Sequence, residues 1–290
     1  MANLKELRNK VGVVQSTRKV TMAMKLVAGV KLKKAEQKVV ASREYAQELG
    51  HILSLIRREL IDVNYELFTG RSLIHTEMLL IFASDKGLCG NFNYLISKEV
   101  FRIISKIHAE NKKIHVVCVG SKLFNIIKQK LLRDDAIELV EDFYRSDKLF
   151  ANAQKLAAKI IADFTDNVVD KVSVVRTKYH SAMQCKVETR SIIPLLREPN
   201  SDRSETIFEP NVEEVLKTTI PYNIAIQIYQ SALESIASEQ GSRMTSMDSA
   251  TRNADELLSE LTTAYNRIRQ YNITQELVEV VSGAAAVARG

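Results

Sequence analysis

The sequence predicts an α/β protein in which the N- and C-terminal helices form a long antiparallel coiled coil flanking a central α/β domain. Both ends of the 290-residue chain repeat apolar or small residues in alternating steps of four and three, the spacing of a coiled-coil seam. Between the ends, short apolar runs alternate with helical patterns. These observations place coiled-coil helices at 1–63 and 211–290 and the α/β domain at 76–205.

The N-terminal helix is predicted from a seam that starts at Ala28. Between Ala28 and Val63 there is no proline, and Gly29 and Gly50 are the only glycines to weaken the helix. An upstream seam at Leu4, Leu7, Val11 and Val14 is interpreted as out of phase with the main one, which predicts a local change in the supercoil. The main seam consists of Ala28, Leu32, Ala35, Val39, Ser42, Ala46, Leu49, Leu53, Ile56, Leu60 and Val63.

The central segment has the pattern of a Rossmann-like α/β layer. Strands are predicted at Met78–Ala83, Ile114–Val119, Lys171–Lys178 and Lys186–Pro194. Helical patterns separate the first three strands at 94–110, 121–132 and 147–164. This alternation predicts a sheet with at least partly parallel pairing. The Pro- and Asn-containing stretch 197–204 is predicted to be a loop that leads back to the coiled coil.

The C-terminal helix is predicted from a seam at Ala250, Ala254, Leu257, Leu261, Ala264, Ile268 and Tyr271. If it begins at Pro221, which suits a first turn, and ends near Val281, it is about 90 Å long at about 1.5 Å per residue. A compact chain of this size has a radius of gyration of about 19 Å. We therefore expect the helix to project and to need a partner helix.

Charge supports pairing between the two ends. Residues 1–43 contain eleven Lys or Arg against Glu6 and Glu36, a net charge of +9. Residues 211–290 contain ten Asp or Glu against six Lys or Arg, a net charge of −4. Exposed ion pairs contribute only about 0–1 kcal/mol each, so the seam should supply most of the stability and the charges should favour the register.

Composition limits the classes of function. The net charge of +6 and the pI near 9.1 suggest an acidic partner. Nucleic acid is one possibility, but no aromatic interleaving, zinc spacing or recognition-helix motif accompanies the basic segment. Cys89, Cys118 and Cys185 are odd in number and widely spaced, which indicates reduced thiols. No apolar run approaches the roughly 18 residues of a membrane span, and the N-terminus has no signal or transit pattern.

The turn Ser84–Asn93 follows a predicted strand but does not carry a known catalytic motif. It matches neither the dinucleotide fingerprint nor a phosphate loop that ends in Gly-Lys-Ser/Thr. The simpler interpretation is a strand-to-helix turn in which Gly87 and Gly90 take unusual backbone angles. Cys89 lacks a local nucleophile signature, although its place on a turn predicts a reachable thiol. The five histidines lack metal-ligand spacing, so no catalytic residue, cofactor site or metal site is predicted.

Several segments together resemble one protein family. The stretches 15–28, 84–93, 238–248, 265–270 and 273–286 are similar, in the right order along the chain, to the gamma subunit of F-type ATP synthase. The resemblance implies an antiparallel coiled coil of the terminal helices beside an α/β domain, in agreement with the residue patterns. It also implies a non-catalytic central-stalk rotor subunit of the F1 part of the proton-translocating enzyme.

The resemblance further implies the partners. They are the hexamer of three alpha and three beta subunits, the epsilon subunit and the c-ring of Fo, with no nucleic acid and with membrane contact only through partner subunits. The rotor would transmit rotation from the c-ring to the catalytic beta subunits. A bacterial form, peripheral on the cytoplasmic face of the inner membrane, is expected.

The family's coupling positions carry over onto residues of this chain. Arg269 and Gln270 match a polar pair near the upper shaft, and Met24 and Arg243 match lower positions. Met22 and Gly241-Ser242 depart from the family pattern, which puts local coupling details in doubt. Met24 is equally well explained by seam packing, and Glu276 and Glu279 by a solvated face. The complete predicted partner-binding set is Met24, Lys86, Gly87, Cys89, Arg243, Arg269, Gln270, Thr274, Glu276 and Glu279.

Two alternative functions remain open from the sequence. One is a coiled-coil scaffold that binds nucleic acid, which the basic N-terminal segment would favour. The other is a Rossmann-like nucleotide-binding enzyme, which the α/β pattern would favour. Recovery of the chain with ATPase subunits, with nucleic acid or with a small molecule would distinguish the three.

Overall fold

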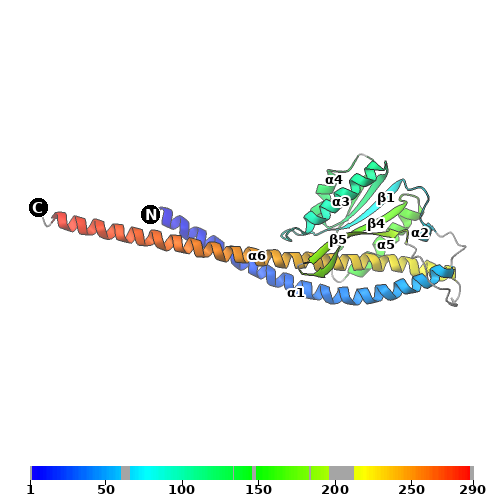
Figure 1. The fold of residues 1–290 in the computed structure, drawn as a ribbon, viewed down its shortest axis with the longest axis horizontal. Helices are drawn as coiled ribbons and strands as arrows, with labels where there is room; N and C mark the ends of the chain where they lie inside the picture. Colours follow the sequence, from blue (N-terminus) through cyan, green and yellow to red (C-terminus); the bar gives the residue numbers. More distant parts are fainter. Residues whose placement is uncertain are drawn as a thin grey trace. The chain divides into compact units, whose positions relative to one another are not determined.

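The computed structural model describes residues 2–59, 66–132, 134–145, 148–182, 184–195 and 212–287. The first and last elements of the chain are two long helices, α1 (Ala2–Glu59) and α6 (Val212–Val287) (Figure 1). The chain divides into two compact units, residues 1–27 with 244–290, and residues 28–243. The predicted seam side chains of Ile56, Leu60 and Val63 and the predicted loop 197–204 lie outside the described part.

The unit of residues 28–243 is built around a five-stranded mixed sheet. Its order is β3-β2-β1-β4-β5, with parallel pairing except between β4 and β5. The strands are β1 (Thr76–Phe82), β2 (Lys113–Val119), β3 (Ala136–Val140), β4 (Lys171–Ser181) and β5 (Gln184–Ile193). The predicted α/β sheet is thus confirmed. Strand β3 was not predicted, because it has only five residues and Glu138 interrupts its apolar pattern.

Helices cover both faces of this sheet. They are α2 (Glu66–Thr69), α3 (Phe92–Ala109), α4 (Ser121–Lys128) and α5 (Leu149–Thr165). Figure 1 shows α3 and α4 on one face, and α5 with α6 on the other. Ile81 of β1 belongs to the core formed with α3 and α4, whereas Phe82 packs on Phe143. Because both faces are covered, β1 is a continuous apolar run from Met78 to Phe82.

Helix α1 packs in this unit as its seam predicts. Ala28, Leu32, Ala35, Val39, Ser42, Leu49 and Leu53 are all buried. Polar bonds fix α1 laterally, since the Arg43 guanidinium pairs with Glu234 of α6 at 2.9 Å. It also donates to the Tyr179 carbonyl of β4 at 2.8 Å. The seam therefore supplies the apolar contact, and Arg43 links α1 to both of its neighbours.

The start of α6 differs from the prediction. The helix begins at Val212, so Pro221 lies inside it and not in its first turn. Pro221 is exposed, and from Ile220 to Arg243 most other residues of α6 are buried or half-buried. This segment is covered on several sides, which explains why a single heptad seam did not describe it.

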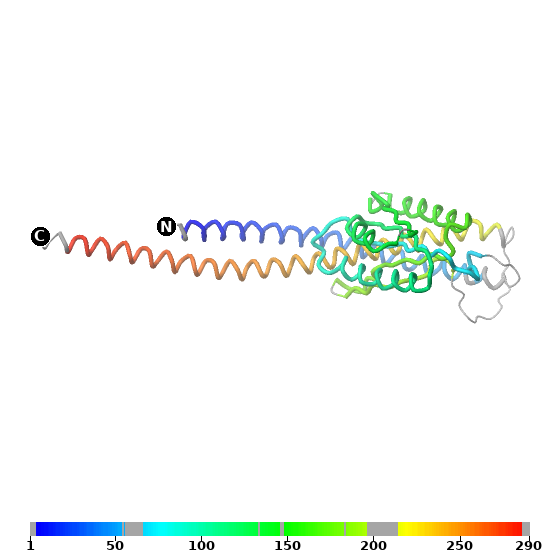
Figure 2. The backbone as a smooth tube through the Cα atoms, turned by 90° about the horizontal axis from the view of Figure 1, so that it is seen from above, coloured from blue at the N-terminus to red at the C-terminus, as the bar shows by residue number. Residues whose placement is uncertain are grey.

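In the unit of residues 1–27 and 244–290, the two helices run antiparallel (Figure 2). The seam of α1 continues from Val14 through Arg18, Thr21 and Lys25 to Ala28 without a change of phase. The predicted phase slip is therefore wrong. Its error arose because three successive seam positions are polar and were not recognised as part of the repeat.

Each polar seam position has a partner on α6. Thr251 Oγ1 donates to Thr21 Oγ1 at 2.8 Å, and Lys25 Nζ donates to Asp248 at 2.5 Å. Arg18 forms an ion pair with Asp255. The hydrogen bonds of Thr21 and Lys25 satisfy polar groups that would otherwise be unfavourable in a seam.

The C-terminal seam is only partly as predicted. Ala254 is buried, and Ala250, Leu261, Ala264 and Ile268 are half-buried. Leu257 and Tyr271 are 44% and 66% exposed, so their assignment to the seam is wrong. Leu258 and Asn272 lie at the half-buried positions instead. No helix in the described part of the chain combines the length and apolar character needed to span a membrane.

Candidate partner-binding site

The turn after β1 occupies the place where α/β sheets usually bind ligands. Strand β1 lies between β2 and β4 in the sheet, and the chain leaves it for α3 and β2. The order of the strands changes direction at this point. In doubly wound sheets, ligands bind beyond the carboxyl ends of the strands at such a switch point. Whether a nucleotide could bind at this position therefore depends on the structure of the turn 83–91.

The chain's own polar groups fill this position. Asp85 Oδ1 accepts a hydrogen bond from the Ser121 amide, at 3.1 Å, where α4 begins. A bound phosphate would use such an amide. Tyr144 donates its hydroxyl to the Ala83 carbonyl at 2.7 Å, and burial raises the pKa of Tyr144 well above its usual range. The groups that would bind a phosphate are thus engaged internally.

A hydrogen-bonded network holds the base of the turn. Asn93 donates to Ser84 Oγ at 2.7 Å and lies 3.4 Å from the sulfur of Cys89. Ser84 Oγ donates to the carbonyl of Lys86 at 2.9 Å. Cys89 is only 3% exposed, so the prediction of a reachable thiol is wrong. Its side chain belongs to the support of the turn.

The tip of the turn is exposed and has one left-handed residue. Lys86, Gly87 and Leu88 are exposed, and Leu88 is 64% exposed. Leu88 has φ 61° and Gly90 has φ 58°, whereas Gly87 has no positive φ. The predicted unusual backbone is thus found at Gly90 and at Leu88, not at Gly87. A non-glycine residue in this region is unfavourable and is concentrated at functional sites.

Helix α6 binds the turn through two adjacent side chains. Arg243 Nη2 donates to the carbonyls of Lys86 and Gly87, at 3.2 and 3.1 Å. Ser242 Oγ donates to the Cys89 carbonyl at 2.7 Å. Arg243 also pairs with Glu239 at 2.7 Å. The structure thus brings together four predicted residues, Lys86, Gly87, Cys89 and Arg243.

Glu239 and Ser242 were not assigned a site role from the sequence. Burial raises the pKa of Glu239, while its ion pair with Arg243 acts in the opposite direction. The Glu-to-Arg spacing of four residues on one helix could have indicated this pair. The contact of Ser242 with a turn 153 positions away could not be read from local sequence.

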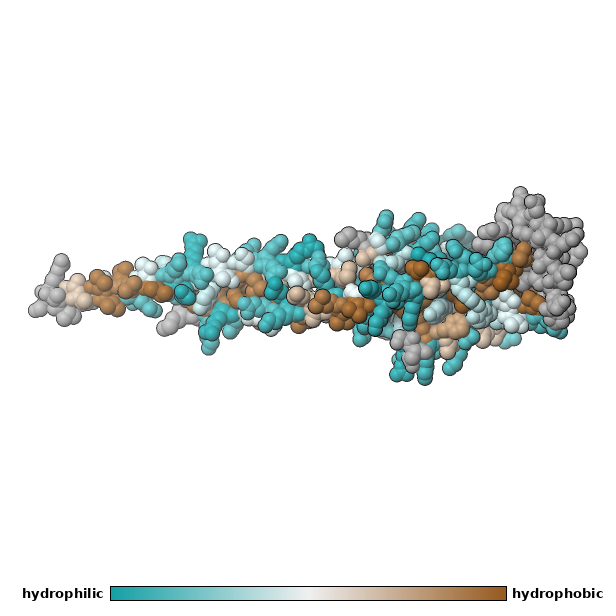
Figure 3. Space-filling view, turned by 90° about the horizontal axis from the view of Figure 1, so that it is seen from below, coloured by the Kyte–Doolittle hydropathy of each residue, from teal (hydrophilic) through white to brown (hydrophobic). Residues whose placement is uncertain are grey.

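The other predicted residues belong to the unit of residues 1–27 and 244–290. Arg269, Gln270, Thr274, Glu276 and Glu279 are exposed on α6, and Met24 on α1 is half-buried. Thr274 bonds locally to the Gln270 carbonyl at 2.9 Å. Leu277, Val278, Val280 and Val281 are also exposed, and Figure 3 shows apolar side chains gathered at this end of α6. This segment exposes both charged and apolar side chains.

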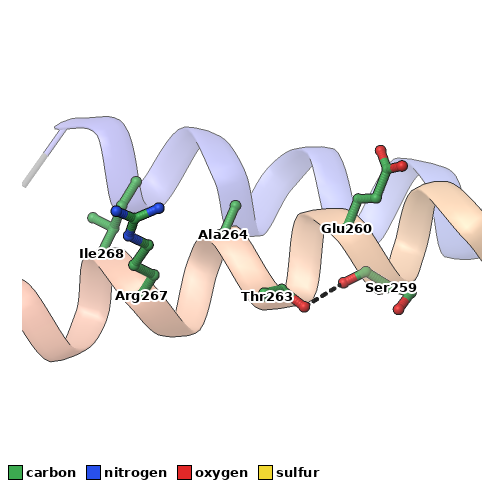
Figure 4. A pocket seen from close by; sticks show the side chains of 6 residues that line it. All are labelled: Ser259, Glu260, Thr263, Ala264, Arg267 and Ile268. Carbon is green, nitrogen blue, oxygen red and sulfur yellow. Dashed lines mark hydrogen bonds between the residues drawn. The ribbon is translucent and has the colours of Figure 1, made fainter.

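A groove on α6 is lined by Ser259, Glu260, Thr263, Ala264, Arg267 and Ile268 (Figure 4). It is open, and four of these six residues are exposed. Among the residues that the structure describes, no cluster of His, Cys, Asp or Glu could hold a metal ion.

Comparison with known proteins gives whole-length relatives. A family model described as ATP synthase matches residues 3–287. The chain is 37% identical to the ATP synthase gamma chain of Paramagnetospirillum magneticum, over 99% of this chain and 100% of the relative. It is 35% identical to that of Pelagibacter ubique, with the same coverage of both chains.

Solved structures with a similar fold come from mitochondrial ATP synthases. A chain from Euglena gracilis mitochondrial ATP synthase has a TM-score of 0.67 and 15% identity, covering 99% of this chain and 95% of that one. A chain from the central stalk and c-ring of the Tetrahymena thermophila enzyme has a TM-score of 0.59 and 22% identity. It covers 80% of this chain and 99% of that one. At these identities the likeness concerns the fold.

Proposed function

Because this chain belongs to the ATP synthase gamma-chain family, we propose that it is the central-stalk rotor subunit of F1. It transmits rotation between the membrane c-ring and the catalytic beta subunits. The observation that carries this function is the similarity to gamma chains over 99% of the sequence. The comparisons give no support to the nucleic-acid-binding alternative.

The proposed partners are the alpha3-beta3 hexamer, the epsilon subunit and the c-ring, with no nucleic acid. The proposed contact surfaces are the tip Lys86–Leu88 with its support, and the exposed end of α6 with Arg269 and Gln270. Two features favour these positions for protein contact. The tip is exposed and includes a left-handed leucine. The end of α6 exposes apolar side chains beside charged ones.

The subunit drives the reaction without performing it. A rotor changes the affinity of a catalytic site only if it makes different contacts with each state of that site. An asymmetric pair of helices with a turn on one side provides such differences. The filled switch point supports a non-catalytic subunit, since Asp85 accepts a hydrogen bond from the Ser121 amide that a bound phosphate would use.

The proposed location is the cytoplasmic face of a bacterial inner membrane, as a peripheral subunit. Bacterial relatives of matching length support it. Coiled-coil segments at 1–63 and 211–290 and an α/β domain at 76–205 remain the proposed domain division. The basic residues of the first 43 positions would then face acidic partner surfaces.

Rotation can be tested with a cysteine at the tip. A Cβ added at Gly87 would meet no atom within 4 Å, so Gly87→Cys is expected to fold and to expose its thiol. A disulfide from this thiol to a cysteine on one beta subunit should stop ATP turnover by the whole complex, and reduction should restore it. The native Cys89 and Cys118 are buried and should not compete, and the half-buried Cys185 is present in the control variant as well.

The matched control is Gly50→Cys, since Gly50 on α1 is equally free of neighbours. Treated with the same oxidant, a complex with this variant and the same beta cysteine should keep its turnover. Full activity with the Gly87 disulfide intact would contradict the rotor function. Recovery of the parent chain with nucleic acid, and without ATPase subunits, would contradict it as well.

A further inference from the structure

We propose that Arg243, held by Glu239, is a positioning residue that fixes the exposed tip Lys86–Leu88 on helix α6. It acts on partner subunits through the shape of this tip and does not contact them itself. This role in coupling rests on the proposed rotor function, whereas the clamp on the tip does not.

The donors of Arg243 are directed inward. Its Nη2 group contacts the carbonyls of Lys86 and Gly87, and its Nη1 group lies 2.7 Å from Glu239. Arg243 is only 8% exposed. A guanidinium has a fixed planar fork of donors, so the groups used here are withheld from a partner. A partner that approaches this surface would meet the tip and not the guanidinium.

The clamp acts on the tip, and a second network holds the base of the turn. The two share the Lys86 carbonyl, because Ser84 Oγ also donates to it, whereas the Gly87 carbonyl is bonded by Arg243. Asn93, Ser84 and Cys89 connect to one another below the tip. Above them, Arg243 and Ser242 bind the carbonyls of Lys86, Gly87 and Cys89. Removing Arg243 should therefore loosen the tip at Gly87 without unfolding the sheet, since Ser84 would still bind the Lys86 carbonyl.

The tip requires such support because one of its residues adopts a backbone conformation of higher energy. Leu88 has φ 61°, in the left-handed region that is unfavourable for a residue with a bulky side chain. A Cβ at Gly87 would meet no atom within 4 Å, so side-chain packing does not restrain this position. The two carbonyls bonded by Arg243 directly precede Leu88 in sequence. Arg243 thus holds the strained residue in its exposed position.

Glu239 completes the clamp from one turn earlier on α6. Its carboxylate forms an ion pair with Arg243, which lies four residues later on the same helix, and so restrains the position of the guanidinium. The buried polar positions on this stretch of α6 include Ser238, Glu239, Gln240 and Arg243. Glu239 thus orients the guanidinium from within α6, while the turn carbonyls bind its other side.

The first experiment measures hydrogen exchange in the full-length chain. Arg243→Ala should increase amide exchange of residues 86–91 by about tenfold or more and leave the helix 92–109 unchanged. Arg243→Lys should give an intermediate increase, because an ammonium cannot reproduce the planar fork. Arg252→Ala is the control, since Arg252 also pairs with an acid four residues earlier but is exposed. Exchange at 86–91 should not change in this control.

The second experiment measures protons pumped per ATP hydrolysed in the assembled complex. Arg243→Ala should lower this ratio about tenfold, Arg243→Lys should restore part of it, and Arg252→Ala should match the parent. If Arg243→Ala does not assemble, Ser242→Ala removes the second tie and should show the same effects to a smaller degree.

Three outcomes would overturn the proposal. Unchanged exchange at 86–91 in Arg243→Ala would show that no clamp exists. Faster exchange with an unchanged ratio of protons pumped per ATP hydrolysed would show that coupling does not require a fixed tip. Lost coupling with unchanged exchange would assign Arg243 to direct partner contact. Failure of the parent chain to assemble with ATPase subunits would reject the rotor function instead, and the exchange result would still decide the clamp.

Discussion

At the scale of single residues, Gly120 fixes the crossing from β2 to α4. It has φ 107°, and an added Cβ would lie 2.4 Å from the Ala83 carbonyl oxygen. We expect Gly120→Ala to lower the free energy of unfolding by about 2–4 kcal/mol, from backbone strain and steric overlap. Urea denaturation of the full-length chain measures the change.

The control for this prediction is Gly87→Ala. Gly87 has no neighbour within 4 Å of a Cβ and no positive φ. Its free energy of unfolding should stay within about 0.5 kcal/mol of the parent. Equal effects of the two substitutions would show that Gly120 is not under steric constraint.

His115 gives a prediction of pH dependence. Burial lowers its pKa below the usual 6.5, and Lys159 acts in the same direction, while Asp163 and Glu138 oppose them. The folded state thus favours the neutral ring. Stability from this group is present above pH 6.5 and is lost as the pH falls through the folded-state pKa.

The matched variant is His115→Gln, which stays neutral. Between pH 7.5 and about 5, its free energy of unfolding should fall less than that of the parent. Urea midpoints at both pH values give the comparison. A larger fall in the variant would mean that the folded state stabilises the charged ring.

Single residues also show where the sequence was sufficient and where it was not. The unusual backbone predicted for the turn after β1 is found at Gly90 but not at Gly87. Burial of Cys89 depends on Ser84 and Asn93 folding back over it, and no local pattern encodes that closure. Arg243 was identified as important through family resemblance, but its inward direction depends on a turn 156 positions away.

At the scale of elements, the polar stretch of the seam predicts a measurable coupling. Arg18 and Asp255 lie opposite each other on the two helices. Arg18→Asp should destabilise the helix pair by placing two carboxylates together. Arg18→Asp combined with Asp255→Arg should restore most of the loss. The coupling energy should be about 0.5–1 kcal/mol, because both side chains are partly exposed.

A thermal double-mutant cycle measures this coupling at low and high salt. At about 1 M salt the Debye length is about 3 Å, so the coupling should become small. An unchanged coupling at high salt would mean that packing, and not charge, connects the two positions.

The helices and most strands were predictable because their periodicity is local. The heptad repeat of α1 identified seven positions that are buried in the structure. The heptad prediction failed at Arg18, Thr21 and Lys25. These residues continue the regular repeat, but they are polar and seam positions were expected to be apolar. Leu257 was assigned to the seam in place of Leu258. The two are adjacent leucines that the sequence alone does not distinguish, and only the partner helix determines which one faces inward.

At the scale of the whole molecule, the exposed end of α6 predicts a difference between the free and assembled protein. All residues from Ile273 to Ala285 are exposed in the chain alone. A helix without packing is marginally stable in water, so amides in this segment should exchange rapidly in the isolated chain. Within the assembled complex their exchange should slow by about tenfold or more.

Hydrogen exchange of both forms tests this prediction, and the buried segment 224–237 of α6 serves as the internal control. Its amides should be protected in both states. If residues 273–285 exchange equally fast in the complex, this end of α6 is not a partner-binding surface.

The pairing of the first helix with the last also affects how the protein is made. Lys25 binds Asp248, which follows it by 223 positions. A ribosome adds about 5–20 residues per second, so the seam of α1 waits about 10–45 s for its partner. All five strands of the sheet are complete once residue 193 has been synthesised. In the nascent chain, the first helix should therefore be the segment that chaperones bind.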